Sequence, residues 1–335
     1  MDESDSSLCV KSAKSAFLDL VARVDPAQAM DFVEWVSEQC NCMLSETTMN
    51  SDEDEEEQEY KDGIMDRIVE DLRKRVPFEG VLSSEKIMFP ESEQVKACLK
   101  PSTTIHIDAF LYNDEEIEKL CDEGKINRHH CNSCGSHDIK PLDFISHSMS
   151  QDQLTYIFKD ILPNLLPSIE GAQLVDVGSR LGAVLYGAAL YSPMKNIFGV
   201  EMNKEFCQIQ QEILQKYKLD KRVKIICSDI CQQELLLRNA NVVILNNVFE
   251  FFQPQVVQAR TWQFLRSSIT KKGCIIVSVP SLEEATKLSS FNNQYIIDLD
   301  NWVDRLLLDG VSLKQTTNIQ HNEVETKEIY FYQVK

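Results

Sequence analysis

The sequence has few of the features that would place the chain in or across a membrane. None of its 335 residues belongs to a run of about 18 consecutive apolar residues, the length that a spanning helix needs. The first residues, Met1-Asp2-Glu3-Ser4-Asp5, are acidic and precede no apolar run, so we expect no secretory leader. The 11 cysteines are odd in number and lack the spacing of a disulfide framework, which favours free thiols in the cytoplasm or the nucleus.

Basic charge is scarce in the N-terminal half of the chain. The net charge is −19, and residues 1–150 hold 33 Asp and Glu against 15 Lys and Arg, whereas the remainder holds 20 against 19. An acidic surface disfavours direct nucleic-acid binding, because attraction to phosphate needs Lys and Arg. It would suit a basic protein partner, although solubility and a solvated linker are the simpler explanation of the acidity.

Composition and periodicity divide the chain into four segments, and no internal repeat is visible. Residues 1–48 are predicted to be helical, and residues 49–60, which contain six consecutive acidic side chains, to be a disordered linker. Residues 61–144 form a mixed region with a helix at 64–76 and a strand at 105–110. Residues 145–335 form the last segment.

The last segment alternates strands and helices. A helix at 153–165 precedes five short apolar runs, which are typical of parallel strands buried on both faces. The runs are residues 173–178, 197–201, 223–228, 242–246 and 274–279. Two more strands, 311–318 and 328–334, follow each other directly and therefore predict an antiparallel hairpin. The expected fold is a doubly wound, Rossmann-like α/β sheet closed by a hairpin, with a mainly helical N-terminal region.

A tight glycine turn follows the first of these strands. The segment Leu174-Val175-Asp176-Val177-Gly178-Ser179-Arg180-Leu181-Gly182 runs from a buried strand through two glycines into a helix. Such a turn brings backbone amides and a helix N-terminus close to a ligand. A nucleotide-binding turn normally has glycine where this chain has Arg180. The arginine can project outward, pair with a ligand carboxylate or obstruct the site.

This arrangement resembles the class I S-adenosylmethionine-dependent methyltransferases, in which five parallel strands are followed by a hairpin. Within that class the segment is similar to the disruptor-of-telomeric-silencing family of non-SET histone-lysine methyltransferases. The similar strings are Val175-Asp176-Val177-Gly178-Ser179 with Gly182, Asn246-Asn247-Val248-Phe249, and Lys272-Gly273. A nicotinamide-dependent oxidoreductase is disfavoured, because its sheet would continue with a sixth parallel strand.

The resemblance implies a cofactor site at the carboxyl ends of the strands. Five turn residues would surround the methionine part of the cofactor: Asp176, Gly178, Ser179, Arg180 and Gly182. Glu201 would accept hydrogen bonds from the ribose hydroxyls, and Asp229 with Ile230 would hold the adenine. The alternatives are a simple strand–helix junction for the glycines and exposed loop carboxylates for Glu201 and Asp229.

The methyl acceptor is expected beside Asn246, which would lie beneath the sulfonium. Glu250 is the nearest carboxylate, so Asn246 and Glu250 are the candidate catalytic residues, although turn and cap roles explain Asn246 and Asn247 equally well. An asparagine-lined pocket suits an amine, which by analogy with the family would be a lysine of a basic protein. The alternative is a catalytically inactive protein of the same fold that acts as a binding or scaffold module. The oligomeric state is not predicted.

A cluster of histidines and cysteines precedes the last segment. Five of the six histidines lie between His106 and His147, and Cys131-Asn132-Ser133-Cys134-Gly135 has the form of a zinc knuckle. Cys131 and Cys134, completed by Cys121 and a histidine such as His137, would form a tetrahedral structural zinc site. The alternative is a pair of reduced thiols on a loop. His147 could border the cofactor site or make a helix-entry hydrogen bond.

Overall fold

The computed structural model describes most of the chain between residue 56 and the C-terminus. The described residues are 56–85, 87, 104–126, 129–131, 139–141, 143–247, 249–289, 297–307 and 329–335. The chain divides into two compact units, Met1–Asp62 and Gly63–Lys335. The predicted helical segment 1–48, residues 49–55 and the predicted strand 311–318 lie outside the described residues.

Residues 56–60 are helical, so the prediction of a linker over 49–60 is wrong at its C-terminal end. Side-chain pairs four residues apart support this helical turn, since Lys61 forms an ion pair with Glu57 and Gln58 donates a hydrogen bond to Asp62. In the second unit, residues 63–73 are also helical. Their buried side chains recur every three or four residues, at Met65, Ile68, Val69 and Leu72.

The second unit is built on a seven-stranded sheet with the order β10-β11-β9-β8-β5-β6-β7. All five predicted parallel strands are present, within one residue of their predicted ends. They are β5 (Gln173–Val177), β6 (Asn196–Glu201), β7 (Val223–Cys227), β8 (Val242–Asn246) and β9 (Ile275–Val279). Because β5 pairs in parallel with both β6 and β8, the order of strands reverses at β5, and the carboxyl ends of these strands meet at one edge.

The end of the sheet differs in detail from the predicted hairpin. β11 (Tyr330–Val334) pairs antiparallel with β9, and β10 (Val303–Arg305) pairs antiparallel with β11 at the sheet edge. β10 therefore runs in the same direction as the five central strands, and β11 is inserted between β9 and β10. No sequence pattern indicates β10, because only Val303 of its three residues is buried.

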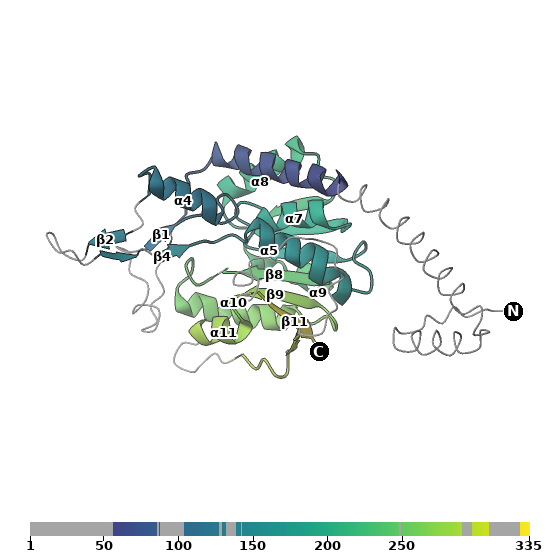
Figure 1. Ribbon diagram of the computed structural model, residues 1–335. Coiled ribbons are helices and arrows are strands. Elements are labelled where there is room, and N and C mark those ends of the chain that lie inside the picture. The colour runs from purple at the N-terminus through teal and green to yellow at the C-terminus, as the bar shows by residue number, and fades with distance from the viewer. Residues whose placement is uncertain are drawn as a thin grey trace, which may run out of the picture. The chain divides into compact units, whose positions relative to one another are not determined.

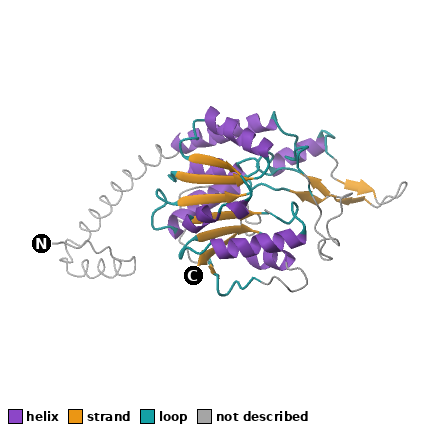
Figure 2. Cartoon of the chain, turned by 180° about the vertical axis from the view of Figure 1, so that it is seen from behind, coloured by secondary structure: helices purple, strands orange, loops and turns teal. Residues whose placement is uncertain are grey.

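Helices cover both faces of the sheet (Figures 1 and 2). One buried cluster joins the helical residues 63–73 to α5, α7 and α8, and a second joins the opposite face to α9, α10 and α11. Besides the helical residues 63–73, the described helices of the second unit are α4 (Asp114–Asp122), α5 (Gln151–Thr155), α6 (Leu162–Leu165), α7 (Ala183–Tyr191), α8 (Lys204–Lys216), α9 (Glu234–Asn239), α10 (Gln255–Ser268) and α11 (Leu282–Ser289). A π-helical turn, Tyr156–Ile161, joins α5 to α6, so the predicted helix 153–165 is present with a local widening.

A smaller substructure precedes the large sheet. β1 (Thr104–His106) pairs in parallel with β4 (Asp143–Ile145), and β2 (His129–Cys131) pairs with β3 (Ile139–Pro141). The predicted strand 105–110 ends at His106. The carboxylate of Asp108 accepts a hydrogen bond from the backbone N–H of Phe110, 3.1 Å away, and so turns the chain.

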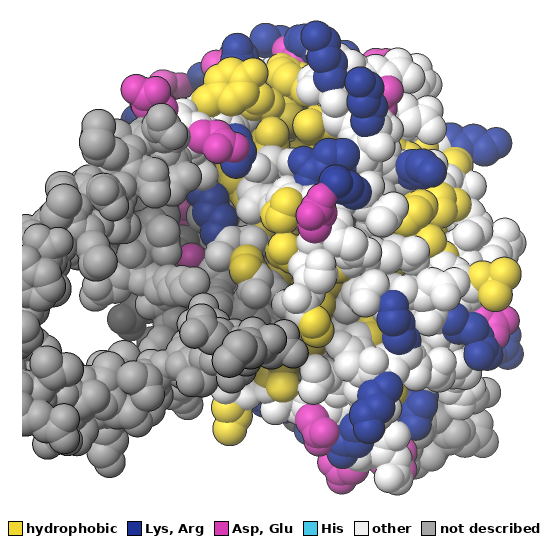
Figure 3. Space-filling view, turned by 90° about the vertical axis from the view of Figure 1, so that its right-hand side faces the viewer, with side chains coloured by type: hydrophobic (Ala, Val, Ile, Leu, Met, Phe, Trp, Pro, Cys, Tyr) yellow, Lys and Arg dark blue, Asp and Glu magenta, His cyan; other side chains and the backbone are white. Residues whose placement is uncertain are grey.

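The acidic excess of the chain does not extend over its whole surface. On the face in Figure 3, Lys and Arg side chains are more prominent than Asp and Glu among the coloured residues. This agrees with the nearly even balance of charge after residue 150. Within the described ranges, no helix combines the length and the apolar character that a membrane span requires.

A substitution at Gly199 in β6 tests how closely side chains pack beneath the glycine turn. A Cβ atom at this position would lie 2.6 Å from Leu185 Cδ1 and 2.8 Å from Ser179 Oγ. We expect Gly199→Ala to lower the free energy of unfolding by about 2 kcal/mol, measured by urea titration. Gly171→Ala is the control, because no atom lies within 4 Å of its added Cβ. Equal stability of Gly199→Ala and the wild type would contradict this packing.

Candidate functional site

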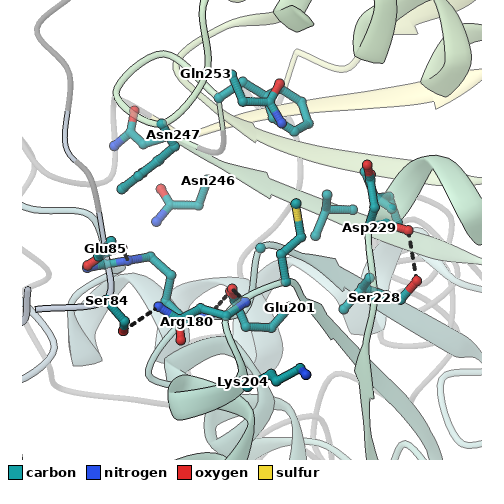
Figure 4. Close-up of a pocket in the computed structure, with 18 of the residues that line it drawn as sticks. Ser84, Glu85, Arg180, Glu201, Lys204, Ser228, Asp229, Asn246, Asn247 and Gln253 are labelled. Atoms are coloured by element: carbon teal, nitrogen blue, oxygen red, sulfur yellow. Dashed lines mark hydrogen bonds and ion pairs between the residues drawn. The ribbon is translucent and has the colours of Figure 1, made fainter. Parts of the chain in front are cut away.

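A cavity of about 780 Å³ opens at the carboxyl ends of β5, β6, β7 and β8. Residues at or just after the ends of all four strands line it, as Figure 4 shows for Arg180, Glu201, Asp229 and Asn246. The structure therefore brings together most of the predicted site. The predicted residues that line the cavity are Gly178, Arg180, Glu201, Asp229, Ile230 and Asn246.

The turn after β5 depends on left-handed backbone conformations. Gly178 has φ 73° and Gly182 has φ 90°, a region in which glycine meets no steric penalty. An added Cβ at Gly182 would also lie 2.8 Å from the hydroxyl of Tyr186, so the site is closed to a side chain. Arg180 adopts φ 39° in spite of its side chain. All three residues thus have the positive φ angle that favours glycine, although the middle one is an arginine.

The side chain of Arg180 is buried and paired. Its Nε and Nη2 donate hydrogen bonds to the two carboxylate oxygens of Glu85, at 2.9 and 3.0 Å. Nη2 also donates to the carbonyl oxygen of Gly80, and Nη1 lies 3.7 Å from Asp108 Oδ2. Since the Arg180 side chain is only 9% exposed, the outward-pointing alternative is excluded. The two acidic partners come from segments that precede Arg180 by more than 70 residues.

Two aromatic rings flank the same guanidinium group. Its central carbon lies 5.2 Å from the ring centre of Phe206 in α8 and 5.5 Å from that of Phe252, which lines the cavity. Both distances are within the range of cation–π attraction. Arg180 therefore connects the glycine turn to α8 and to the loop after β8.

Glu201 lies at the end of β6, and both of its carboxylate oxygens accept backbone hydrogen bonds. The N–H of Arg180 donates to Oε2 at 2.9 Å, and the N–H of Asn203 donates to Oε1 at 2.7 Å. Burial raises the pKa of Glu201, while these two hydrogen bonds act in the opposite direction. Each oxygen retains a lone pair for a further donor, such as a ligand hydroxyl.

Three predicted turn residues lie behind the cavity wall. Asp176 is 3% exposed, and burial together with the nearby carboxylate of Glu201 raises its pKa to about 8. The hydroxyl of Ser179 donates to the side chain of Gln210, whose amide in turn donates to the carbonyl oxygen of Arg180. Asp176, Ser179 and Gly182 thus support the turn, and none of the three is part of the cavity lining.

Asp229 and Ile230 begin a short 3-10 helix, Ile230–Gln232, after β7. Asp229 Oδ1 accepts a hydrogen bond from the N–H of Cys231 at 2.8 Å, so this carboxylate caps the helix as it lines the cavity. Ile230 is buried but contributes an apolar surface to the lining. Met202 also lines the cavity and is 61% exposed, which leaves an apolar rim beside it.

The other end of the cavity is lined by amides and aromatic rings. Asn246, Asn247, Phe249, Phe252 and Gln253 contribute to this wall. The side-chain amide of Asn246 donates to the backbone oxygen of His147, 3.3 Å away. We call these five lining residues the acceptor wall.

Glu250, a candidate catalytic residue, is not part of the lining. It borders a second, much smaller cavity, which Asn247 and Phe249 separate from the first one. Burial raises the pKa of the Glu250 carboxyl, and the nearby carboxylate of Glu284 contributes to the shift. The structure therefore places Glu250 behind the acceptor wall.

The predicted zinc ligands are only partly within the described residues. The backbone of His129–Cys131 forms β2, but the side chain of Cys131 and all of Cys134 and His137 lie outside. Cys121 is a free thiol at the C-terminal end of α4. No group of three potential metal ligands occurs among the residues that the structure describes.

Sequence reasoning missed the N-terminal contribution to the site. Ser84 and Glu85 line the cavity (Figure 4). The Asn203 side chain donates to Ser84 Oγ, which donates to Glu205. The only available signal was Arg180 itself, because a cation at that position needs a buried acidic partner. The sequence could not show which of the 33 acidic side chains before residue 150 would serve.

Removal of one partner from the buried ion pair of Arg180 with Glu85 is expected to destabilise the fold strongly. We expect Arg180→Met to lower the free energy of unfolding by about 3 kcal/mol, because it leaves buried carboxylates without a cation. Glu85→Gln in the same chain should restore part of this loss, measured by urea unfolding of the four chains of a double-mutant cycle. Lys195→Met is the control, since its pair with Glu170 is more than half exposed on both sides and should change stability by less than about 0.5 kcal/mol. Additive effects of the two substitutions would contradict the pairing.

Asp176 should make stability depend on pH. A carboxyl group whose pKa is raised by folding, here to about 8, binds its proton more tightly in the folded state. Its favourable contribution is complete below the unfolded pKa and is lost as pH rises toward 8. We therefore expect Asp176→Asn to stabilise the protein more at pH 8 than at pH 4, relative to the wild type, in urea titrations at both pH values. If Asp176→Asn changed the free energy of unfolding by the same amount at both pH values, the buried, neutral state of Asp176 would be contradicted.

Comparison with known proteins bears on this fold and site. Residues 148–312 match the sequence model of the family described as histone methylation protein DOT1. The chain is also 25% identical over 122 residues to a carboxy-S-adenosyl-L-methionine synthase of Psychromonas ingrahamii. That alignment covers 31% of this chain, and the chain spans only half the length of that protein.

Several solved structures are similar over part of the chain. A putative O-methyltransferase from Klebsiella pneumoniae has 11% identity and a TM-score of 0.37, over 57% of this chain and 83% of that one. An RNA methyltransferase from Salinibacter ruber, solved with S-adenosyl-L-homocysteine, has 13% identity and a TM-score of 0.34, over 56% of this chain and 92% of that one. On the family match, residues 148–312 are similar to the DOT1 histone methylation family, and the strand order agrees with the Rossmann-like methyltransferase fold predicted from the sequence.

Proposed function

We propose that this protein transfers a methyl group from S-adenosylmethionine to a lysine-type amine of a basic protein. The observation that carries the proposal is the single cavity around which Glu201, Asp229 and Asn246 lie at the ends of three strands. Its volume of about 780 Å³ is within the range of cofactor pockets. The match to a histone methylation family supports a basic protein as the partner.

The residues present fit this cofactor on grounds of chemistry. Glu201 offers two buried carboxylate oxygens that can accept from ribose hydroxyls, in addition to the backbone hydrogen bonds they already accept. Met202 and Ile230 provide the apolar surfaces that an adenine ring requires, and Asp229 lies beside them as an acceptor for its amine. The turn Gly178 to Gly182 would hold the methionine part, and Arg180, which lines the cavity beside it, would supply positive charge for the ligand carboxylate.

The acceptor wall suits an amine. The Asn246 amide nitrogen is engaged with the backbone oxygen of His147, so its carbonyl oxygen is the group left to accept a hydrogen bond from the methyl acceptor. Phe249 and Phe252 place apolar rings at the same end of the cavity, which favours an unsolvated nucleophile. The bound cofactor would supply a methyl group on a positively charged sulfur, and the chain's own residues align the nucleophile with it.

Glu201 provides the sharpest test of cofactor binding. We expect Glu201→Gln to weaken the binding of S-adenosylhomocysteine by 10- to 100-fold in calorimetric titration, because charge-assisted hydrogen bonds contribute about 1.5–3 kcal/mol. Glu234→Gln is the matched control, since this exposed carboxylate pairs with Arg238 on α9 and is not part of the cavity lining. It should leave the affinity unchanged.

The acceptor is tested separately from the cofactor. We expect radiolabelled methyl groups to appear on lysines of core histones when the wild-type chain is supplied with labelled S-adenosylmethionine. Binding of S-adenosylhomocysteine without transfer to histones or to poly-L-lysine would favour the inactive binding module or another acceptor. Absence of binding at millimolar ligand would overturn the proposed function itself.

A further inference from the structure

A pair of histidines lies directly behind the acceptor wall. Nδ1 of His106 is 3.0 Å from Nε2 of His147, and the two rings are stacked with an interplanar angle of 22°. His147 is 5% exposed, whereas His106 is only partly buried. The pair therefore forms a polar path from a buried position toward the surface.

His147 contacts the acceptor wall on two sides. Its backbone oxygen accepts the hydrogen bond of Asn246, and its ring packs edge-on against Phe252, at a centroid distance of 5.1 Å. Phe251 packs against the ring at the same distance. His147 is thus separated from the cavity by a single layer of side chains.

Both histidines are fixed by the segments that carry them. β1 and β4 pair His106 with Ile145, and the N–H of Ala109 donates to Ser146 Oγ at 2.8 Å. Ser148 Oγ donates to Asp108 at 2.7 Å on the other side of His147. Because hydrogen bonds hold the chain on both sides of His147, its ring is positioned before any ligand binds.

Nδ1 of His147 is buried and has no hydrogen-bond partner among the described residues. The hydrogen between the two rings can lie on either histidine. If His147 carries it on Nε2, the buried Nδ1 is a bare lone pair, and an unpaired acceptor is less unfavourable than an unpaired N–H. This tautomer leaves Nδ1 ready to accept a proton.

Methylation of an amine releases one proton, and the acceptor wall contains no base to take it. The carboxylates that line the cavity are Glu85, Glu201, Glu205 and Asp229. Each already accepts a hydrogen bond, Glu85 and Glu201 from Arg180, Glu205 from Ser84, and Asp229 from the N–H of Cys231. Among the described residues of the acceptor wall only amides and phenyl rings occur.

We infer, on the basis of the proposed function, that His147 and His106 conduct the proton of the acceptor amine out of the site. The ammonium N–H bond breaks and its proton passes through water to His147 Nδ1. In the same step the His147 Nε2 proton moves to His106 Nδ1, so that His147 never holds a positive charge, and His106 releases a proton to solvent. The freed nitrogen lone pair forms the N–CH3 bond as the C–S bond breaks, so charge and atoms balance. His147 is a positioning and relay residue.

The charges around the pair disfavour a histidine that remains positively charged, so a proton that enters the pair is passed on. Burial lowers the pKa of His147 to about 2, and the positive charge of Arg180 and the neighbouring His106 act in the same direction. Burial and Arg180 also lower the pKa of His106, but the carboxylates of Glu79 and Glu85 oppose this. These carboxylates favour a proton on His106, which draws the proton toward the surface.

Histidine NMR tests the tautomer without any turnover. Long-range 15N–1H spectra of imidazole-labelled wild-type protein should show His147 neutral from pH 5 to pH 9, with its proton on Nε2. His147→Gln identifies the signal. A proton on Nδ1 of His147 in the free protein would overturn the relay. This result is independent of whether the protein binds S-adenosylhomocysteine.

Kinetics of methyl transfer to core histones test the path itself. We expect His147→Gln and His106→Asn to bind S-adenosylhomocysteine within about 2-fold of the wild type but to lose about 100-fold in kcat at pH 7. Their rates should rise about tenfold for each pH unit up to pH 9, because the amine must then lose its proton to water unaided, while the wild-type rate stays nearly flat.

Phe251→Leu is the matched control, because it loosens the packing on His147 without changing a proton carrier. It should keep the flat pH profile of the wild type. A pH profile of His147→Gln parallel to that of the wild type, or a steep profile of Phe251→Leu, would overturn the relay and assign a purely structural role to the His147 ring. If the wild type did not bind S-adenosylhomocysteine, the proposed function itself would be contradicted instead.

Discussion

The buried guanidinium group of Arg180 is the constraint on which the rest of the site depends. A desolvated cation is tolerated in a protein interior only if it is paired and hydrogen-bonded. Its partners Glu85 and Asp108 come from segments far upstream, and its flanking rings come from α8 and from the loop after β8. Four parts of the chain must therefore meet at the glycine turn. The cavity wall at Ser84 and Glu85 follows from this requirement.

The same residue explains how the turn works without its middle glycine. A left-handed conformation costs a residue with a side chain about 1–2 kcal/mol. At Arg180 this cost is offset by the hydrogen bond from its N–H to Glu201 and by the paired side chain. The carboxylate expected to bind ribose is therefore coupled to the ion pair through one residue. The arginine contributes to the organisation of the turn that it was expected to disturb.

The sequence predicted the parts of the fold that arise from local periodicity. The five apolar runs, the glycine turn and the carboxylates Glu201 and Asp229 were each readable because the chain places them at strand ends in a fixed order. Other features were not readable, because they depend on pairing between distant residues. The contact of Arg180 with Glu85 spans 95 positions, and Gln210 gives no local sign that it holds the turn. β10 was missed because three residues with one buried side chain form no pattern. Glu250 was placed too near the cavity, because its proximity to Asn246 along the chain does not show which side of the loop faces the cavity.

The region outside the family match is part of the site and is not an appendage. Residues 148–312 contain Arg180 and Asn246, but Glu85, Asp108, His106 and His147 all lie before residue 148. A chain that began at residue 148 would leave a buried cation unpaired and would remove the backbone oxygen that orients Asn246. Because both defects are buried, neighbouring water could not correct them at low cost. The second compact unit, Gly63–Lys335, contains all of these groups together with their partners.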